Sequence, residues 1–133
     1  MEDFVPFEIA KKLKEKGFTC ELPLAMYNET GQFCLLTSSA PYHVCDSGYK
    51  YRMFYDYEDF DEFDYITPTI SQVLKWLREE KKLHIIIPAS FDEGYWWEIR
   101  NFNKEISEYS DEEYKTYEES ALAGIEYVLD NLI

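Results

Sequence analysis

The chain has 133 residues, of which 46% are hydrophobic and 18% aromatic, with only five glycines and five prolines. This composition is typical of one globular domain and excludes a disordered or fibrous chain, so we expect residues 1–133 to form a single domain. The net charge of −14 excludes nucleic acid as a partner, because neutralisation of phosphates by lysine and arginine dominates that kind of affinity.

The negative charge is concentrated in two segments. Residues 55–65, which read YDYEDFDEFDY, contain six acids and no base, and residues 105–133 contain nine acids and one base, Lys115. These two segments account for the whole net charge. A basic protein surface is therefore the partner that electrostatics favours.

The sequence predicts a protein of the cytoplasm that does not enter a membrane. It contains no run of about 18 apolar residues, the length that a spanning helix requires. The N-terminus begins with acids and lacks the basic start and apolar centre of a signal peptide. The three cysteines are accordingly expected to be reduced thiols.

The first predicted helix covers residues 6–16, where Ile9, Ala10 and Leu13 share one face and Gly17 ends the pattern. Two strands, residues 22–27 and 32–37, follow around a turn that contains Asn28 and Gly31. From Tyr49 to Tyr57 aromatic and polar residues alternate, which indicates a further strand with one buried face.

The acidic segment 55–65 combines rings and carboxylates. We expect its rings to be buried and its carboxylates to be exposed, because water rejects the rings and the interior rejects unpaired charges. The rings are those of Tyr55, Tyr57, Phe60 and Phe63. The candidate interaction surface consists of the carboxylates of Asp56, Glu58, Asp59, Asp61, Glu62 and Asp64.

A second helix is predicted over residues 68–82. Either Thr67, followed by Pro68, or Thr69, with Gln72 completing a capping box, is suited to begin it. Its apolar stripe consists of Ile70, Val73, Leu74 and Leu77.

The last third predicts a hairpin and a third helix. Residues 83–87 and 95–102 form two antiparallel strands, and the adjacent Trp96 and Trp97 point to opposite sides of the sheet. An acidic linker then leads to a helix over residues 117–131, opened by a capping box at residues 116–119. The apolar stripe of this helix is Leu122, Ile125, Leu129 and Leu132.

These elements predict an α+β fold in which three helices pack on an antiparallel sheet of four to five strands. The layers form either a two-layer arrangement or a helix–sheet–helix sandwich. The predicted core consists of Ile9, Leu13, Ile70, Val73, Leu74, Leu77, Ile85, Ile87, Ile99, Leu122, Ile125 and Leu129.

The segments TPTISQVLKWLREEKKLHI, GYWWEI and TYEESALAGIEYVLDNL resemble a family of small uncharacterised proteins encoded in phages, prophages and mobile elements of gut Bacteroidetes. The resemblance covers mainly residues 67–133. It implies a fold and a genomic context, and it carries no catalytic residue.

Two groups of residues in the sequence contain possible metal ligands. Cys20, Cys34, His43 and Cys45 lack the close ligand pairs of structural zinc sites. The acids from Asp56 onward lack the glycine and glutamate that a calcium loop requires at its sixth and twelfth positions. We therefore expect neither a metal nor a cofactor.

Two functions from different classes follow. The favoured one is a non-enzymatic accessory protein of a phage or mobile element that binds another protein through an acidic surface. The alternative is a small metal-dependent hydrolase that uses clustered Asp and Glu side chains with His43 or His84.

Overall fold

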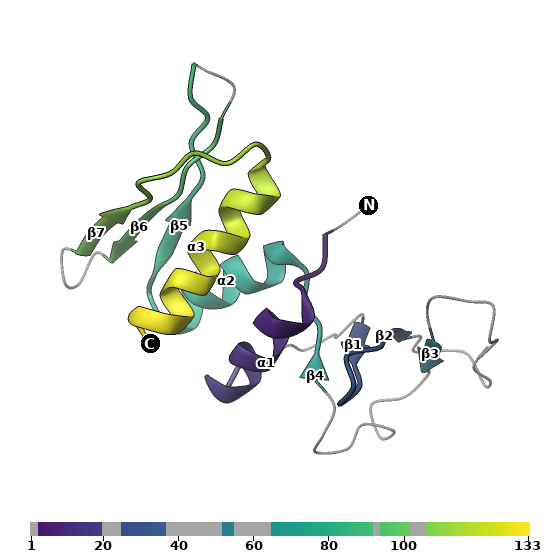
Figure 1. The fold of residues 1–133 in the computed structure, drawn as a ribbon. Coiled ribbons are helices and arrows are strands. Elements are labelled where there is room, and N and C mark those ends of the chain that lie inside the picture. The colour runs from purple at the N-terminus through teal and green to yellow at the C-terminus, as the bar shows by residue number, and fades with distance from the viewer. Residues whose placement is uncertain (1–2, 20–24, 37–51, 55–64, 92–93, 102–105) are drawn as a thin grey trace. The chain divides into compact units, whose positions relative to one another are not determined.

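A computed structural model of the protein describes residues 3–19, 25–36, 52–54, 65–91, 94–101 and 106–133. The α+β class is confirmed, because these residues form three helices and seven strands (Figure 1). The strands form two sheets, of four and three strands, where the sequence had predicted one. None of the described helices is both long and apolar enough to cross a lipid bilayer.

The chain divides into two compact units. Residues 4–68 form the N-terminal unit, and residues 69–133 form the C-terminal unit together with the first residues of the chain.

The N-terminal unit contains the four-stranded sheet. Its strands are β1 (Ala25–Tyr27), β2 (Phe33–Leu36), β3 (Arg52–Phe54) and β4 (Tyr65–Ile66), in the order β3-β2-β1-β4. The hairpin β1–β2 is antiparallel, as predicted, and its turn is closed by Asn28 Oδ1, which accepts hydrogen bonds from the backbone of Thr30 and Gln32. In contrast to the predicted antiparallel order, β3 runs parallel to β2. The connection of fifteen residues between them, 37–51, is long enough for a parallel crossover.

Helix α1 (Phe7–Glu15) confirms the first predicted helix and ends before Gly17, whose φ is 80°. Its residues Ile9, Ala10 and Leu13 are buried. The ring of Phe7 makes edge-to-face contacts with Tyr27 and Tyr65 at centroid distances of 5.4 and 5.5 Å. Aromatic packing therefore joins this helix to strands β1 and β4.

Helix α2 (Ile70–Glu80) begins at Thr69, the second of the two predicted caps. The Thr69 hydroxyl accepts from Gln72 N at 3.2 Å, and Gln72 Oε1 accepts from Thr69 N at 2.9 Å. This capping box satisfies two backbone groups at the helix start. Because the cap is Thr69, the helix starts two residues later than predicted.

The C-terminal unit has a three-stranded antiparallel sheet in the order β5-β6-β7. Its strands are β5 (His84–Ile86), β6 (Glu98–Asn101) and β7 (Ile106–Tyr109). The hairpin β5–β6 was predicted, but the linker assigned to residues that include 106–109 was wrong, because they form β7. A segment of four residues among charged ones is too short for an alternating pattern to predict a strand. Residues 106–109 form a strand because they pair with β6.

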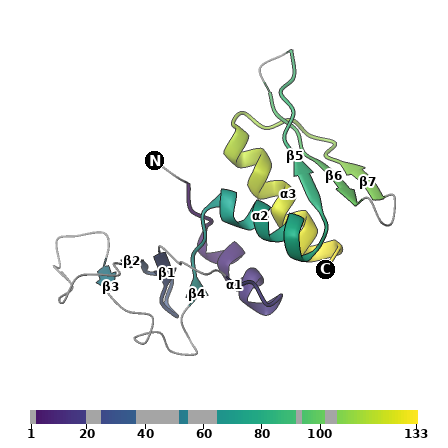
Figure 2. The same ribbon diagram turned by 180° about the vertical axis from the view of Figure 1, so that it is seen from behind.

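Helix α3 (Tyr117–Asn131) lies with α2 on one side of this sheet (Figures 1 and 2). The Thr116 hydroxyl caps it by accepting from Glu119 N at 3.1 Å. The predicted stripe was partly wrong, because Leu122 and Leu132 are only half-buried. The buried face is instead formed by Ser120, Ala121, Gly124, Ile125, Val128 and Leu129.

Gly124 explains this rotation of α3. A Cβ atom at Gly124 would lie 3.2 Å from Ile85 Cγ2 and 3.2 Å from Trp97 Cβ, so the helix backbone comes very close to the sheet there. A larger residue at this point would force the helix away. The glycine therefore allows this close approach, and Leu122 and Leu132 lie at the margin of the buried face while Leu129 belongs to it.

Nine of the twelve predicted core residues are buried. Ile85, Ile87 and Leu122 are half-buried, which corrects the prediction for these three. Ile85 lies on the edge strand β5, which has a neighbouring strand on one side only. An edge position leaves part of a side chain accessible to water even when it faces a helix.

Candidate interaction surface

The predicted interaction surface lies in residues 56–64. Its carboxylates lie outside the described residues: Asp56, Glu58, Asp59, Asp61, Glu62 and Asp64. The rings predicted to be buried beside them also lie outside the described residues, namely Tyr55, Tyr57, Phe60 and Phe63. Both predictions about this segment stay predictions.

The residues weighed for metal chemistry have a similar outcome. Cys20, His43 and Cys45 lie outside the described residues, and Cys34 is placed only as a backbone position of β2. His84 is half-buried in β5. Within the part of the chain that the structure describes, no three His, Cys, Asp or Glu side chains gather as a metal site would require.

The second acidic segment is described for most of its length. Asp111, Glu112 and Glu113 form an exposed acidic bend between β7 and α3. Ser110 holds the start of this bend against the sheet, because its amide donates to Trp97 O at 3.0 Å and its hydroxyl donates to Glu112 O at 2.9 Å. The end of the bend is held by Tyr114, whose backbone exchanges two hydrogen bonds with Tyr95 at 2.8 and 2.7 Å.

Helix α3 carries a second set of exposed carboxylates. Glu119, Glu126 and Asp130 are all exposed and form an acidic stripe on this helix. Their spacings of seven and four residues place them in one line along the helix, because each spacing is close to a whole number of turns. The acidic bend and the acidic stripe therefore contribute six exposed carboxylates in the C-terminal unit.

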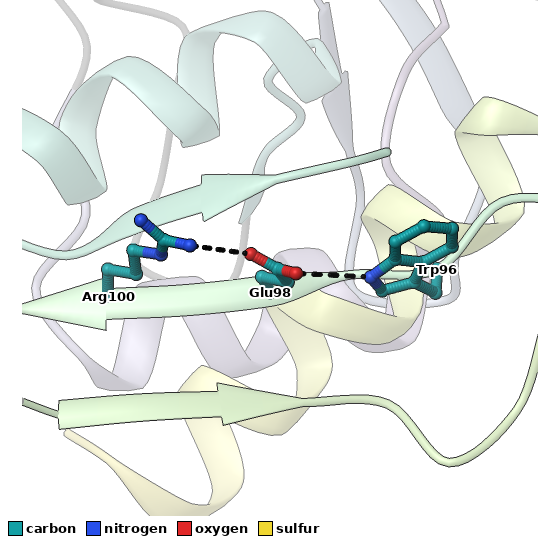
Figure 3. A network of polar contacts seen from close by, with 3 residues as sticks. All are labelled: Trp96, Glu98 and Arg100. Atoms are coloured by element: carbon teal, nitrogen blue, oxygen red, sulfur yellow. Dashed lines mark hydrogen bonds and ion pairs between the residues drawn. The ribbon is translucent and has the colours of Figure 1, made fainter. Parts of the chain in front are cut away.

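The sheet of the C-terminal unit has one covered and one open side. Trp96 shares the side of Glu98 and Arg100 (Figure 3), whereas Trp97 contacts Tyr127 of α3, so the two point to opposite sides, as predicted. Trp97 is only 6% exposed, and its ring lies 4.9 Å from that of Tyr127 in α3. Trp97 therefore belongs to the helix-covered side, and Trp96 to the side that faces away from α2 and α3.

Three polar side chains form a line on this open side (Figure 3). Glu98 accepts a hydrogen bond from Trp96 Nε1 at 3.3 Å and pairs with the Arg100 guanidinium at 3.2 Å. Alternate residues of an extended chain share a face, so Trp96, just before β6, lies in line with Glu98 and Arg100 of this strand. The pairing leaves Glu98 with its charge balanced locally.

Apolar side chains flank Glu98 on both neighbouring strands. The register pairs Glu98 with Ile86 of β5 on one side and with Tyr109 of β7 on the other. Ile86 is 41% exposed and Tyr109 is 68% exposed. Ile86, Trp96, Glu98, Arg100 and Tyr109 together are called the open face here.

The covered side contains a polar cluster of its own. A hydrogen bond between Tyr127 and the Glu108 carboxylate raises the pKa of Tyr127, and burial and the negative charge of Glu108 raise it further. Trp97 Nε1 and Glu108 Oε2 are buried, and neither atom has a hydrogen-bond partner among the described residues. This cluster links Glu108 of β7 and Trp97, just before β6, with Tyr127 of α3.

The sequence pointed to only part of this surface. It predicted that Trp96 and Trp97 point to opposite sides of the sheet and that the acids of residues 105–133 form a charged region. It missed Ile86 and Tyr109, since their position beside Glu98 depends on the register of three strands. The pair of apolar neighbours around Glu98 becomes visible only once β7 is known.

No family model matches the chain, and no significant match was found among curated proteins or solved structures.

Proposed function

We propose that the protein is a non-enzymatic module that binds a basic partner protein through its acidic surface. In this proposal it acts in the cytoplasm as an accessory protein of a phage or mobile element, the context that the resemblance implies. The carboxylates of residues 56–64 are proposed as a separate acidic region of the N-terminal unit.

The observation that supports the proposal is the exposure of the carboxylates in the acidic bend and the acidic stripe. They lie in a segment, residues 105–133, that contains a single base. Such a surface attracts lysine and arginine over several ångströms and accelerates encounter with a basic partner. It repels the phosphates of nucleic acid for the same reason.

The test compares two variants with the same change in net charge. One neutralises the acidic bend by Asp111→Asn, Glu112→Gln and Glu113→Gln. The matched control neutralises three exposed acids elsewhere by Glu15→Gln, Glu79→Gln and Glu80→Gln. A partner is identified by capture from the source cells at low salt, purified, and titrated against both variants and the unchanged protein.

We expect the bend variant to lose affinity and salt dependence, and the control to bind as the unchanged protein does. Exposed pairs are screened beyond about 10 Å at 0.1 M salt, so the affinity of the unchanged protein should fall as salt rises. Equal losses in both variants, or an affinity that ignores salt, would refute a localised acidic binding surface.

A further inference from the structure

The open face departs from what an outward sheet face normally presents. An antiparallel sheet with helices on one side keeps polar side chains on its other side. Here Ile86, Trp96 and Tyr109 occupy outward positions, in a protein whose net charge is −14. All four exposed large hydrophobic residues among the described ones lie in the C-terminal unit, and two of them belong to this face.

The open face is also held in a defined arrangement before any partner arrives. Trp96 is fixed by its backbone hydrogen bond to Pro88 O at 3.1 Å and by its indole bond to Glu98 at 3.3 Å. Arg100 balances the charge of Glu98 from the other side (Figure 3). Side chains ordered in advance lose less conformational entropy on binding, which favours affinity.

The acidic bend lies directly beside this face. It begins two residues after Tyr109, and hydrogen bonds join Ser110 to Trp97 and Tyr114 to Tyr95, the two residues that flank Trp96 just before β6. An apolar centre with a charged rim is the usual anatomy of a protein interface, with tryptophan and tyrosine as frequent anchors. The negative rim selects a partner whose apolar residue is flanked by positive charges.

We propose that the open face is the anchoring part of the binding surface and that it receives an apolar side chain flanked by lysine or arginine on another protein. This inference rests on the proposed function, because the acidic bend supplies its charge complementarity. A second copy of the chain is a poor occupant, since two copies would each bring a net charge of −14 and an acidic bend to the same contact.

The probes are linear peptides selected from a random display library on the immobilised full-length protein and then synthesised. Their affinities are measured by titration calorimetry for the unchanged protein and for Tyr109→Ala and Trp96→Ala. Phe91→Ala is the matched control, since Phe91 is a fully exposed aromatic residue in the β5–β6 connection, beyond the ends of the strands. Circular dichroism melts establish that each variant is folded. If Trp96→Ala does not fold, Tyr109→Ala still tests the inference, because the Tyr109 side chain is largely exposed.

We expect the selected peptides to carry an aromatic or aliphatic residue between basic ones. Tyr109→Ala and Trp96→Ala should lower the affinity for these peptides by roughly 10- to 100-fold, the loss typical of an aromatic anchor. Phe91→Ala should leave the affinity unchanged. Unchanged affinity in Tyr109→Ala, or an equal loss in Phe91→Ala, would overturn the inference.

The neutralised bend separates this inference from the proposed function. If the bend variant loses binding and Tyr109→Ala does not, the acidic surface stands and the open face is not its anchor. If Tyr109→Ala loses binding and the bend variant retains it with the same salt dependence, the acidic surface fails. A dimer in sedimentation velocity that Tyr109→Ala dissociates would assign the face to a second copy and overturn the proposed occupant.

Discussion

Trp96 and Trp97 are neighbours in the chain, yet they belong to two surfaces with opposite physical roles. Trp97 lies on the helix-covered side, beside the buried Ile99 and the small residues of α3. Trp96 lies on the open face and donates a hydrogen bond to Glu98, which the exposed Ile86 and Tyr109 flank on the neighbouring strands. The comparison teaches that the two sides of one sheet can contribute unequally to stability, because removal of a side chain costs more folding free energy on the side where it is buried.

The largest expected effect comes from the covered side. Trp97→Ala should lower the free energy of unfolding by about 3–5 kcal/mol, because it removes a buried ring and leaves a cavity against Tyr127. Trp96→Ala should cost about 1 kcal/mol or less, since Trp96 retains access to water. Urea denaturation of both variants measures the difference. Equal losses of unfolding free energy in the two variants would show that both sides of the sheet contribute equally to stability.

The close approach of α3 provides the second test. Gly124→Ala would place a methyl group 3.2 Å from Trp97 Cβ, an atom next to the backbone that has little freedom to move. Overpacking lowers the free energy of unfolding by about 1–3 kcal/mol. The better helix propensity of alanine raises it by about 1 kcal/mol. We therefore expect a net loss of about 1 kcal/mol in thermal or urea unfolding. A more stable variant would mean that the strands move enough to accommodate the methyl group.

The ion pair on the open face should contribute little to folding. A double-mutant cycle with Glu98→Gln and Arg100→Gln is expected to give a coupling energy of about 0.2–1 kcal/mol, because the Arg100 side chain is 53% exposed. The same cycle at 1 M salt should give a smaller value. A coupling above about 2 kcal/mol would assign the pair a structural role and weaken the division between the two faces.

The smallest effect concerns the titration of Tyr127. Glu108→Gln should lower the pKa of Tyr127 towards the ordinary value of 10.0, because the hydrogen bond and the negative charge of Glu108 both raise it. Ultraviolet absorbance of tyrosinate during alkaline titration, assigned by comparison with Tyr127→Phe, measures this shift.

The sign of the linked stability follows from the raised pKa. The contribution of Tyr127 is fully present below pH 10 and is lost as the pH rises through the raised pKa of the folded protein. The alkaline loss of stability should therefore be smaller in Tyr127→Phe. An unchanged titration in Glu108→Gln would contradict the contact between β7 and α3.

The predicted site was accessible to sequence reasoning only where charge alone defined it. The acids of residues 105–133 were identified by counting, and the structure shows the acidic bend and the acidic stripe exposed. The apolar part of the surface was not identified from the sequence. Ile86 and Tyr109 lie more than twenty residues apart, and they are brought onto one face because both pair with Glu98. The register between strands that are distant in the chain cannot be predicted from a single sequence.

The sequence by itself determined the three helices, the cap of α3 and the opposite orientation of Trp96 and Trp97. These features depend on periodicity and on capping residues within a few positions, so local physics specifies them. The tertiary structure alone decided that Thr69 caps α2, that residues 106–109 form a strand, and that Trp97 is the buried one of the pair. Strand pairing requires a distant partner, and the rotation of α3 follows from the close approach at Gly124, so both are decided by contacts that only the folded chain brings together.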